Sequence, residues 1–376
     1  MKNYDVIVVG LGVMGAAAAY QCSKRGLRVL GLDSNKQGHR MGSSHGSTRA
    51  IRQTYFENPG YVPLVQRSYE MWRELERESG EGLMSLTGAL YLAAENHAML
   101  NGVKSAATTY NLPLQTFSPA ELTQRFPGFV IPQGWQALYE SDGGIIQAER
   151  SQHLQVELAR QLSADIRYQT EALSWQQHNG FVRVETESGQ YDAGQLILTI
   201  GPWACNKLGY LNLPLQGRKI TAVTFNPKVC NQYNPRDFSV YFWATPEGVF
   251  AGFPNIDGEG IKIMRHDAQN TCTPENVDRE IQQLDIDEVR QFADKYMPNV
   301  DGGINNVFTC MYTMTPDNHF VIDQVSADSN IYYATGFSGH GFKFAPVVGE
   351  ILADFAQFGE TEHPIGFLRS DRFIQL

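Results

Sequence analysis

Residues 4–35 read YDVIVVGLGVMGAAAAYQCSKRGLRVLGLDSN, and this stretch decides the fold. Residues 4–9 form an apolar run rich in β-branched side chains, which favours a buried strand. An alanine-rich segment follows and ends at Gly26, as a helix would. Residues 28–32 form a second short apolar run. The order strand, turn, helix, strand predicts the first unit of a nucleotide-binding domain.

The turn in this unit carries the pattern G-x-G-x-x-G at Gly10, Gly12 and Gly15, and Asp33 follows eighteen positions later. The first glycine permits a tight turn, and the second lets a pyrophosphate approach the backbone. The third lets helix and strand pack closely, and Asp33 can bind ribose hydroxyls. The free N–H groups at the start of the helix favour phosphate. The pattern predicts a dinucleotide cofactor but does not separate FAD from NAD.

Length, charge and cysteine usage narrow the class of protein. A chain of 376 residues is long enough for two domains with a sizeable core. A formal net charge of −10 disfavours a nucleic-acid partner. No apolar stretch approaches the roughly 20 residues that a membrane helix needs. The five scattered cysteines form no CxxC pair, so we expect neither a disulfide framework nor a metal site, and we expect a reducing, cytoplasmic setting.

A cluster of basic residues follows the second strand. Residues 42–55 read GSSHGSTRAIRQTY and contain His45, Thr48, Arg49 and Arg52. The glycines and serines predict a loop that leads into an extended or helical segment, and in a helical turn the two arginines would share a face. The cluster fits a solvated loop, or two arginines that bind a substrate carboxylate near the cofactor.

A second glycine-rich turn lies near the other end of the chain. Residues 331–356 read IYYATGFSGHGFKFAPVVGEILADFA, which predicts a strand, a turn of close approach and a buried helix over residues 342–355. The N-terminus of such a helix favours negative charge. Lys343 in the first turn opposes the helix dipole, which marks it as a functional residue or as a lysine whose head reaches water.

The middle of the chain predicts a second domain. Ser118 and Glu121 form a capping box, and residues 147–165 have the period of an amphipathic helix. A buried strand at residues 196–200 ends at Gly201-Pro-Trp203. Four strand-like runs follow and are typical of an antiparallel sheet; they are residues 219–225, 239–245, 248–254 and 260–266.

Lys262 and His266 flank the last of these runs and share one face by period 2. From the pattern alone, this face fits the solvated side of an edge strand or a functional surface.

The motifs together resemble those of the monomeric sarcosine oxidase and N-methyltryptophan oxidase group of FAD amine oxidases. The resemblance covers nearly the whole chain and is most specific in GSSHGSTRAIR, in GFSGHGFKFAPVVGEILADFA, and in the Cys310 segment with its TPD turn. Pipecolate oxidases share these signatures. The resemblance implies covalent attachment of FAD through Cys310, where a structural buried cysteine would be the alternative. Ala251 replaces a tyrosine that is common in the group, which leaves the side-chain preference open.

The resemblance also implies roles for the cations. Lys262 matches a lysine that promotes oxygen reduction, and Arg52 and Lys343 match a pair that binds the substrate carboxylate. His45, Thr48 and Arg49 match residues around the flavin ring, and His266 matches an active-site histidine. The full set of expected cofactor-binding residues is Gly10, Gly12, Met14, Gly15, Asp33, Ser34, Ser43, Thr48, Gly201, Trp203, Cys310, Gly336, Gly339, His340 and Gly341.

The expected fold is mixed α/β, of the glutathione-reductase-like or D-amino-acid-oxidase-like type. A Rossmann-type FAD-binding domain is expected from residues 1–85, 146–215 and 320–376. An antiparallel-sheet substrate domain is expected from residues 86–145 and 216–319.

The expected reaction is oxidation of an N-methyl amino acid by a monomeric enzyme, with molecular oxygen as acceptor. The alternatives are a pipecolate-type secondary amine oxidase, a flavin dehydrogenase with another acceptor, and a non-catalytic flavin-binding protein.

Overall fold

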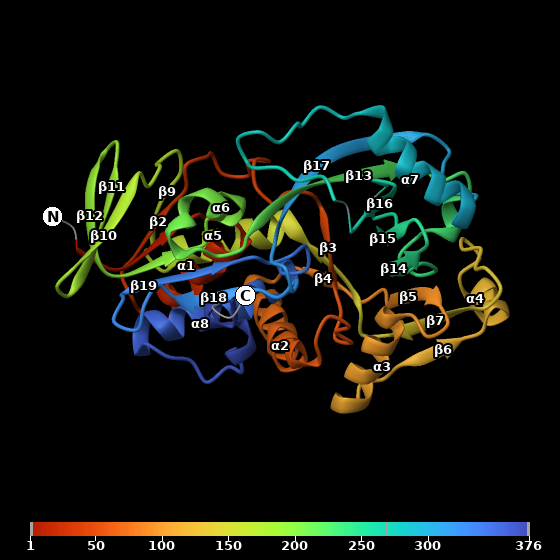
Figure 1. Cartoon of the computed structure of the whole chain (residues 1–376), viewed down its shortest axis with the longest axis horizontal. Coiled ribbons are helices and arrows are strands. Elements are labelled where there is room, and N and C mark those ends of the chain that lie inside the picture. Colours follow the sequence, from red (N-terminus) through yellow and green to blue (C-terminus); the bar gives the residue numbers. More distant parts are fainter. Residues whose placement is uncertain (1–2, 257, 268, 374–376) are drawn as a thin grey trace.

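The chain folds around two large sheets that lie at opposite ends of the molecule (Figure 1). The computed structural model describes residues 3–256, 258–267 and 269–373. None of the helices within these ranges is both long enough and apolar enough to cross a membrane.

The first sheet has the strand order β10-β11-β12-β1-β2-β9, with β19 beside β12 and β18 beside β19. β1 lies parallel to both β2 and β12, and β19 is also parallel to β12, as in a doubly wound nucleotide-binding sheet. The strands are β1 (Asn3–Val9), β2 (Val29–Leu32), β9 (Asp165–Arg167), β10 (Ser174–His178), β11 (Phe181–Thr186), β12 (Gly189–Leu198), β18 (Val321–Gln324) and β19 (Ile331–Thr335).

Three helices pack together beside this sheet: α1 (Val13–Lys24), α5 (Ala148–Gln161) and α8 (Ala345–Phe358). α2 (Val62–Ser79) also packs against α8. The predicted C-terminal helix has a different beginning, because Phe342–Phe344 forms a 3-10 turn, η5, and α8 starts only at Ala345. Pro346 lies in the first turn of α8, where a missing N–H costs nothing.

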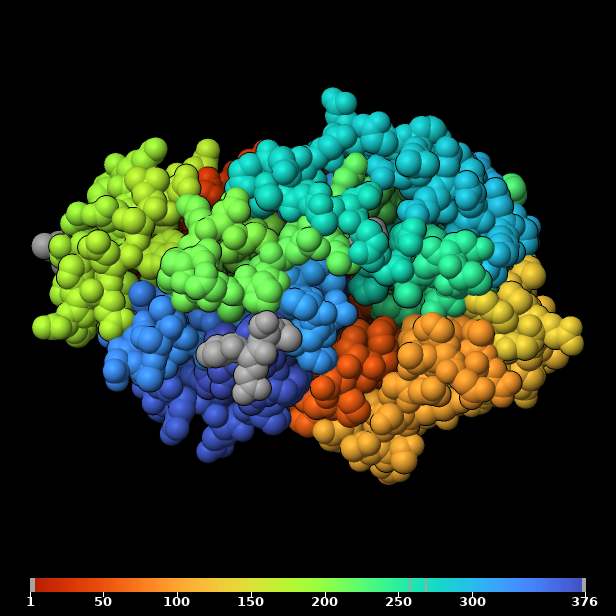
Figure 2. Space-filling model, viewed as in Figure 1, coloured from red at the N-terminus to blue at the C-terminus, as the bar shows by residue number. Residues whose placement is uncertain are grey.

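The second sheet has the order β17-β13-β16-β15-β14-β5-β7-β6. The four predicted runs are antiparallel neighbours, but β14 also pairs in parallel with β5, a joint that the sequence pattern did not predict. This pairing brings distant segments side by side in the space-filling view (Figure 2). The strands are β5 (Ala89–Ala94), β6 (Gln115–Phe117), β7 (Trp135–Glu140), β13 (Gln216–Phe225), β14 (Val240–Thr245), β15 (Gly248–Phe253), β16 (Ile261–Arg265) and β17 (Ile304–Met314).

Helix α7 (Gln283–Tyr296) covers one face of the second sheet. Tyr241 and Trp243 of β14 pack in the same core cluster as Phe292 of α7, whereas Phe242 between them belongs to another cluster. This alternation follows because successive side chains of a strand point to opposite faces of the sheet. The face opposite α7 is therefore available to line a cavity. The remaining helices are α3 (Ala98–Tyr110), α4 (Pro119–Arg125), which begins with the predicted capping box, and α6 (Ala204–Lys207).

A small third sheet contains β3 (Thr48–Ile51), β8 (Gly144–Gln147) and β4 (Met84–Ser85). The helical alternative for the basic cluster is therefore wrong, because the segment is extended and pairs with β8. In an extended chain, side chains three residues apart do not share a face, so Arg49 and Arg52 take different surroundings.

The strands of the first sheet come from residues 3–198 and 321–335, and those of the second from residues 89–140 and 216–314. The two parts thus interleave along the chain, and the exact domain boundaries given above stay a prediction.

The crossing of α1 and α8 requires a glycine. A Cβ atom added to Gly349 would lie 2.6 Å from the carbonyl carbon of Ala17. Gly349→Val should therefore push the two helices apart and lower the free energy of unfolding by about 1–3 kcal/mol, as overpacking does. Urea unfolding followed by circular dichroism measures this. Gln357→Val on the exposed side of α8 is the matched control, and equal losses in the two variants would contradict the packing argument.

Candidate active site

A cavity of about 270 Å³ has walls from both sheets. The turn after β1 and the end of β2 line one part of it, through residues that include Gly10, Gly12 and Asp33. The face of the second sheet that α7 does not cover lines another part of the cavity. Residues of the 336–343 turn also line the cavity. Segments far apart in the sequence therefore meet at one site.

The second sheet contributes a row of directly opposed side chains. Phe242, Ala251, Met264, Ala222 and Phe308 follow one another across β14, β15, β16, β13 and β17, and all five line the cavity. The register alternates large and small residues across the wall.

The next positions of the same face place Cys310 opposite Ile220 and bring in His266, and these three also line the cavity. The predicted cysteine and histidine thus lie on one wall. Cys310 is 7% exposed, and its Sγ lies 3.9 Å from the carbonyl oxygen of Ser43.

The glycine turn has the geometry of a ligand cradle. Gly10 has φ +88°, and a Cβ there would lie 2.6 Å from the carbonyl oxygen of Thr199. A Cβ on Gly12 would meet only the hydroxyl of Ser44, at 3.2 Å, so close packing by backbone does not explain this glycine. Asp33 accepts hydrogen bonds from the N–H groups of Leu11 and Asn35, both at 2.8 Å, which fixes the turn against the end of β2.

Several buried polar atoms of cavity-lining residues have no hydrogen-bond partner among the described residues. Nε2 of His45 and Oγ1 of Thr335 are among them. Buried polar groups are normally paired, so these atoms fit a polar ligand that completes the site. Burial and the neighbouring charge of Arg49 lower the pKa of His45 to about 4.

Most of the predicted site residues line the cavity. They are Gly10, Gly12, Met14, Asp33, Ser34, Ser43, His45, Arg49, Arg52, Gly201, Trp203, His266, Cys310, Gly336, Gly339, His340, Gly341 and Lys343. Gly15, Thr48 and Lys262 lie outside the lining. Gly15 instead faces Gly10, whose carbonyl oxygen would lie 1.8 Å from an added Cβ.

Lys262 is buried and interior to the second sheet, so the edge-strand alternative is wrong. Its ammonium donates to the carbonyl oxygen of Thr48 at 2.8 Å and to the hydroxyl of Thr48 at 2.5 Å. It also lies 4.0 Å from the ring centroid of Phe253, which lines the cavity. Burial and the charge of Arg49 lower its pKa well below the ordinary value. No carboxylate pairs with Lys262 within the described ranges.

Arg49 is held by backbone carbonyls. Its guanidinium donates to the carbonyl oxygens of Thr48 at 2.9 Å, Ser43 at 3.0 Å and His45 at 2.6 Å. These bonds tie the 42–49 segment into a loop that carries a fixed positive charge.

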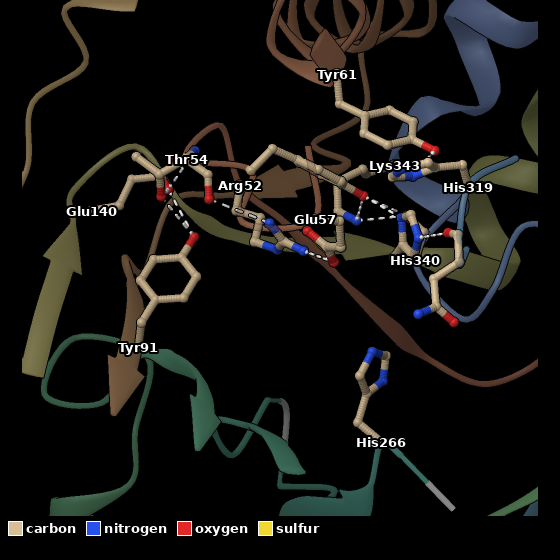
Figure 3. A network of polar contacts seen from close by, with 12 residues as sticks. Arg52, Thr54, Glu57, Tyr61, Tyr91, Glu140, His266, His319, His340 and Lys343 are labelled. Carbon is tan, nitrogen blue, oxygen red and sulfur yellow. Dashed lines mark hydrogen bonds and ion pairs between the residues drawn. The ribbon is translucent and has the colours of Figure 1, made fainter. Parts of the chain in front are cut away.

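Arg52 is fully buried and forms an ion pair with Glu57 (Figure 3). Its guanidinium carbon lies 4.1 to 5.0 Å from the ring centroids of Tyr55, Phe56 and Phe242. Burial alone would raise the pKa of Glu57, but the charge and hydrogen bond of Arg52, together with His340 and Lys343, more than offset burial and lower the pKa to about 2. Nε of Arg52 and Oε2 of Glu57 have no partner among the described residues.

The segment that carries Arg52 is anchored by a second buried carboxylate. Glu140 accepts hydrogen bonds from the N–H of Thr54 at 3.0 Å and from the hydroxyl of Tyr91 at 2.9 Å. It also accepts from the hydroxyl of Thr54. These bonds hold the turn after β3 against the second sheet, at the left of Figure 3.

His266 points toward the Arg52 and His340 group in the same view. Its Nδ1 lies 3.2 Å from the hydroxyl of Tyr312. Burial is the main reason that the pKa of His266 falls to about 4. The imidazole is therefore neutral near pH 7.

Sequence reasoning missed Glu57, Tyr55, Glu140 and Tyr312. Glu57 lies only five residues after Arg52, so an acid close to the basic cluster was the available signal. Nothing in the local pattern marked Glu140 or Tyr312, because their neighbours in space are far away in the chain.

Comparison with known proteins places this site in a family. The family model of FAD dependent oxidoreductases matches residues 5–355. The chain belongs to the FAD dependent oxidoreductase family. FAD is therefore its cofactor, and the cradle at Gly12, Asp33 and His45 fits it.

The chain is 39% identical over 369 residues to a monomeric sarcosine oxidase of Streptomyces avermitilis, covering 97% of this chain and 96% of that protein. It is 30% identical over 377 residues to an N-methyl-L-tryptophan oxidase of Salmonella dublin, covering 99% and 100%. Among solved structures, the L-proline dehydrogenase from P. horikoshii matches with a TM-score of 0.87 at 22% identity, over 100% of this chain and 98% of that one. That likeness shows the fold.

The buried histidines predict sensitivity to acid. In the unfolded chain a histidine binds a proton below about pH 6.5, whereas His45 stays neutral in the fold down to about 4. The unfolded state then binds more protons, so the free energy of unfolding should fall as the pH drops from about 6.5 toward 4. For His45 the loss between pH 7.5 and 5 should be about 2 kcal/mol.

Urea unfolding at the two pH values tests this, with His45→Gln expected to remove that part of the loss. His97→Asn, at an exposed position where the new residue keeps the helix cap, is the control. An unchanged pH dependence in His45→Gln would contradict the assignment.

Proposed function

We propose that this protein is an FAD-dependent oxidase that demethylates an N-methyl amino acid of the sarcosine or N-methyl-L-tryptophan type. The N-methyl carbon loses a hydride equivalent and the amine loses a proton, and the resulting imine takes up water to give amine and formaldehyde. Oxygen takes up the two electrons and two protons as hydrogen peroxide. The observation that carries the proposal is the meeting of a dinucleotide cradle and the buried cations Arg52 and Lys343 in one cavity.

The cradle residues would hold FAD along the cavity. Gly10 and Gly12 at the start of α1 would receive the pyrophosphate, and Asp33 would receive the ribose. When bound, FAD supplies the two-electron redox chemistry that the side chains cannot supply. The protein orients the amine and sets the charges around it.

The substrate carboxylate would bind between Lys343 and Arg52. Lys343 is buried and has no carboxylate partner among the described residues, so a ligand carboxylate would satisfy it. Arg52 already pairs with Glu57, so it contributes as a compensated cation with a free Nε. Neutral His266 is suited to hold the substrate amine, because it adds no positive charge beside it.

Lys262 would promote the reduction of oxygen. An anion forms from oxygen as the electrons arrive, and an ammonium already fixed by Thr48 stabilises that anion without reorganisation. Arg49, held by three carbonyls, supplies a second fixed charge nearby.

The direct test of the reaction is product analysis. Purified protein incubated with sarcosine or N-methyl-L-tryptophan in air should release formaldehyde and hydrogen peroxide in equal amounts. Oxidation that yields no formaldehyde, or that requires an added quinone in place of oxygen, would overturn the proposal.

Covalent attachment of FAD at Cys310 is part of the proposal. The thiol lies in the cavity wall, so acid-precipitated protein should stay yellow, and a peptide that contains Cys310 should be heavier by one FAD. Mass spectrometry of Cys310→Ser should show no modified peptide, whereas Cys272→Ser, at a cysteine outside the cavity lining, should keep it. Complete release of flavin from the wild type would contradict the attachment.

The role of Lys262 separates an oxidase from a dehydrogenase. Lys262→Met should be reduced by the amine at nearly the wild-type rate but reoxidised by oxygen about a thousand-fold more slowly, by analogy with the loss of an oxyanion donor. Stopped-flow spectroscopy measures the two half-reactions separately. Lys219→Met removes another buried lysine of the same sheet and should leave both rates unchanged. Unchanged reoxidation of Lys262→Met would assign this lysine a structural role alone.

A further inference from the structure

Among the described residues, no carboxylate forms a hydrogen bond or an ion pair with the Lys343 ammonium. The main-chain carbonyl of Lys343 accepts hydrogen bonds from Ser68 Oγ at 2.5 Å and from Trp72 Nε1 at 2.9 Å. Both donors belong to α2, so this helix fixes the backbone of η5. The ammonium itself donates to the carbonyl oxygen of His340 at 2.7 Å and to the hydroxyl of Tyr55 at 3.3 Å. No third acceptor touches it within the described ranges, and Lys343 lines the cavity.

The hydrogen bonds behind this ammonium can run in one direction only. The carbonyl oxygen of Asn318 can only accept, so Nε2 of His340, 2.8 Å away, must carry the proton. Burial lowers the pKa of His340 to about 3, so its ring is neutral and Nδ1 is an acceptor.

The hydroxyl of Tyr55 lies 2.6 Å from that Nδ1 and therefore donates to it. The carbonyl oxygen of His340 is a more distant alternative acceptor, at 3.2 Å, and Lys343 already uses it. With its proton committed, the Tyr55 oxygen presents lone pairs to Lys343. Figure 3 shows Lys343 and His340 side by side.

We propose that Tyr55 and His340 are positioning residues that hold the Lys343 ammonium so that one N–H remains for the substrate carboxylate. This inference rests on the proposed function, in which Lys343 binds that carboxylate. It gives the His340 side chain a role different from direct contact with the cofactor. It also explains how a buried lysine keeps a defined direction without a carboxylate partner among the described residues, since two of its three donors are used by fixed oxygens.

The test compares a charged and a neutral ligand of the same shape. Methoxyacetate carries the carboxylate, and methoxyacetamide replaces it with an amide. The dissociation constant of each is measured from the change in flavin absorbance of the FAD-loaded protein. Tyr55→Phe keeps the ring in its aromatic cluster and removes only the hydroxyl.

Tyr55→Phe should raise the methoxyacetate dissociation constant about ten-fold, the loss expected for one hydrogen bond to a charged group, and leave the methoxyacetamide constant unchanged. Tyr61→Phe is the matched control. Its ring lies 4.8 Å from that of Tyr55, but its hydroxyl accepts from the N–H of Phe320 and does not contact Lys343. This control should change neither constant.

A double-mutant cycle separates positioning from packing. In a Lys343→Met background, Tyr55→Phe should have no further effect on methoxyacetate, because the group that it positions is gone. His340→Leu should resemble Tyr55→Phe when Lys343 is present. Equal loss of both ligands in Tyr55→Phe, or an unchanged methoxyacetate constant, would overturn the inference.

The outcomes also distinguish the inference from the proposed function. If Lys343→Met does not weaken methoxyacetate selectively, the carboxylate assignment of Lys343 fails. If Lys343→Met does so but Tyr55→Phe does not, only the positioning role fails.

Discussion

The burial of several positive charges around one cavity is the constraint on which the rest of the structure depends. A buried cation without compensation costs several kcal/mol, so the protein must surround each with fixed acceptors or rings. The structure does this in three ways: Arg52 pairs with Glu57, Lys262 donates to Thr48, and Lys343 donates to Tyr55 and His340. The contacts of Lys262 with Thr48 and of Lys343 with Tyr55 join segments that are distant in the sequence, whereas Arg52 and Glu57 lie five residues apart.

The fold supplies these partners because two sheets and a small third one meet at the cavity. β3 brings Thr48 to the interior strand β16, which carries Lys262. The turn after β19 brings the 336–343 segment back beside the first sheet, and α2 ties down its backbone. The same arrangement of the sheets places the dinucleotide cradle at one part of the cavity and the buried cations at another. An amine and a flavin would need this arrangement in order to react.

Much of this could be predicted from sequence, because the signals were local. The turn at Gly10 to Gly15, the parallel strands that flank it and the four antiparallel runs of the second sheet follow from apolar periodicity and glycine spacing. The parallel pairing of β14 with β5 could not be predicted, because nothing in the sequence of either strand identifies its partner.

The missed polar partners have the same explanation. The acceptor that a buried lysine finds, such as Thr48 for Lys262, depends on how sheets meet in space and not on a spacing along the chain. The carboxylate anchor Glu140 and the directed chain from His340 to Tyr55 are likewise visible only in three dimensions.

The central claim is that the buried cations select an amino acid whose N-methyl group is then oxidised. The most direct test is anaerobic reduction of the bound FAD, measured as the loss of flavin absorbance. Sarcosine or N-methyl-L-tryptophan should bleach the flavin completely, and the counterparts that lack the carboxylate, dimethylamine and N-methyltryptamine, should do so far more slowly at equal concentration. Equal rates with and without the carboxylate would contradict the account.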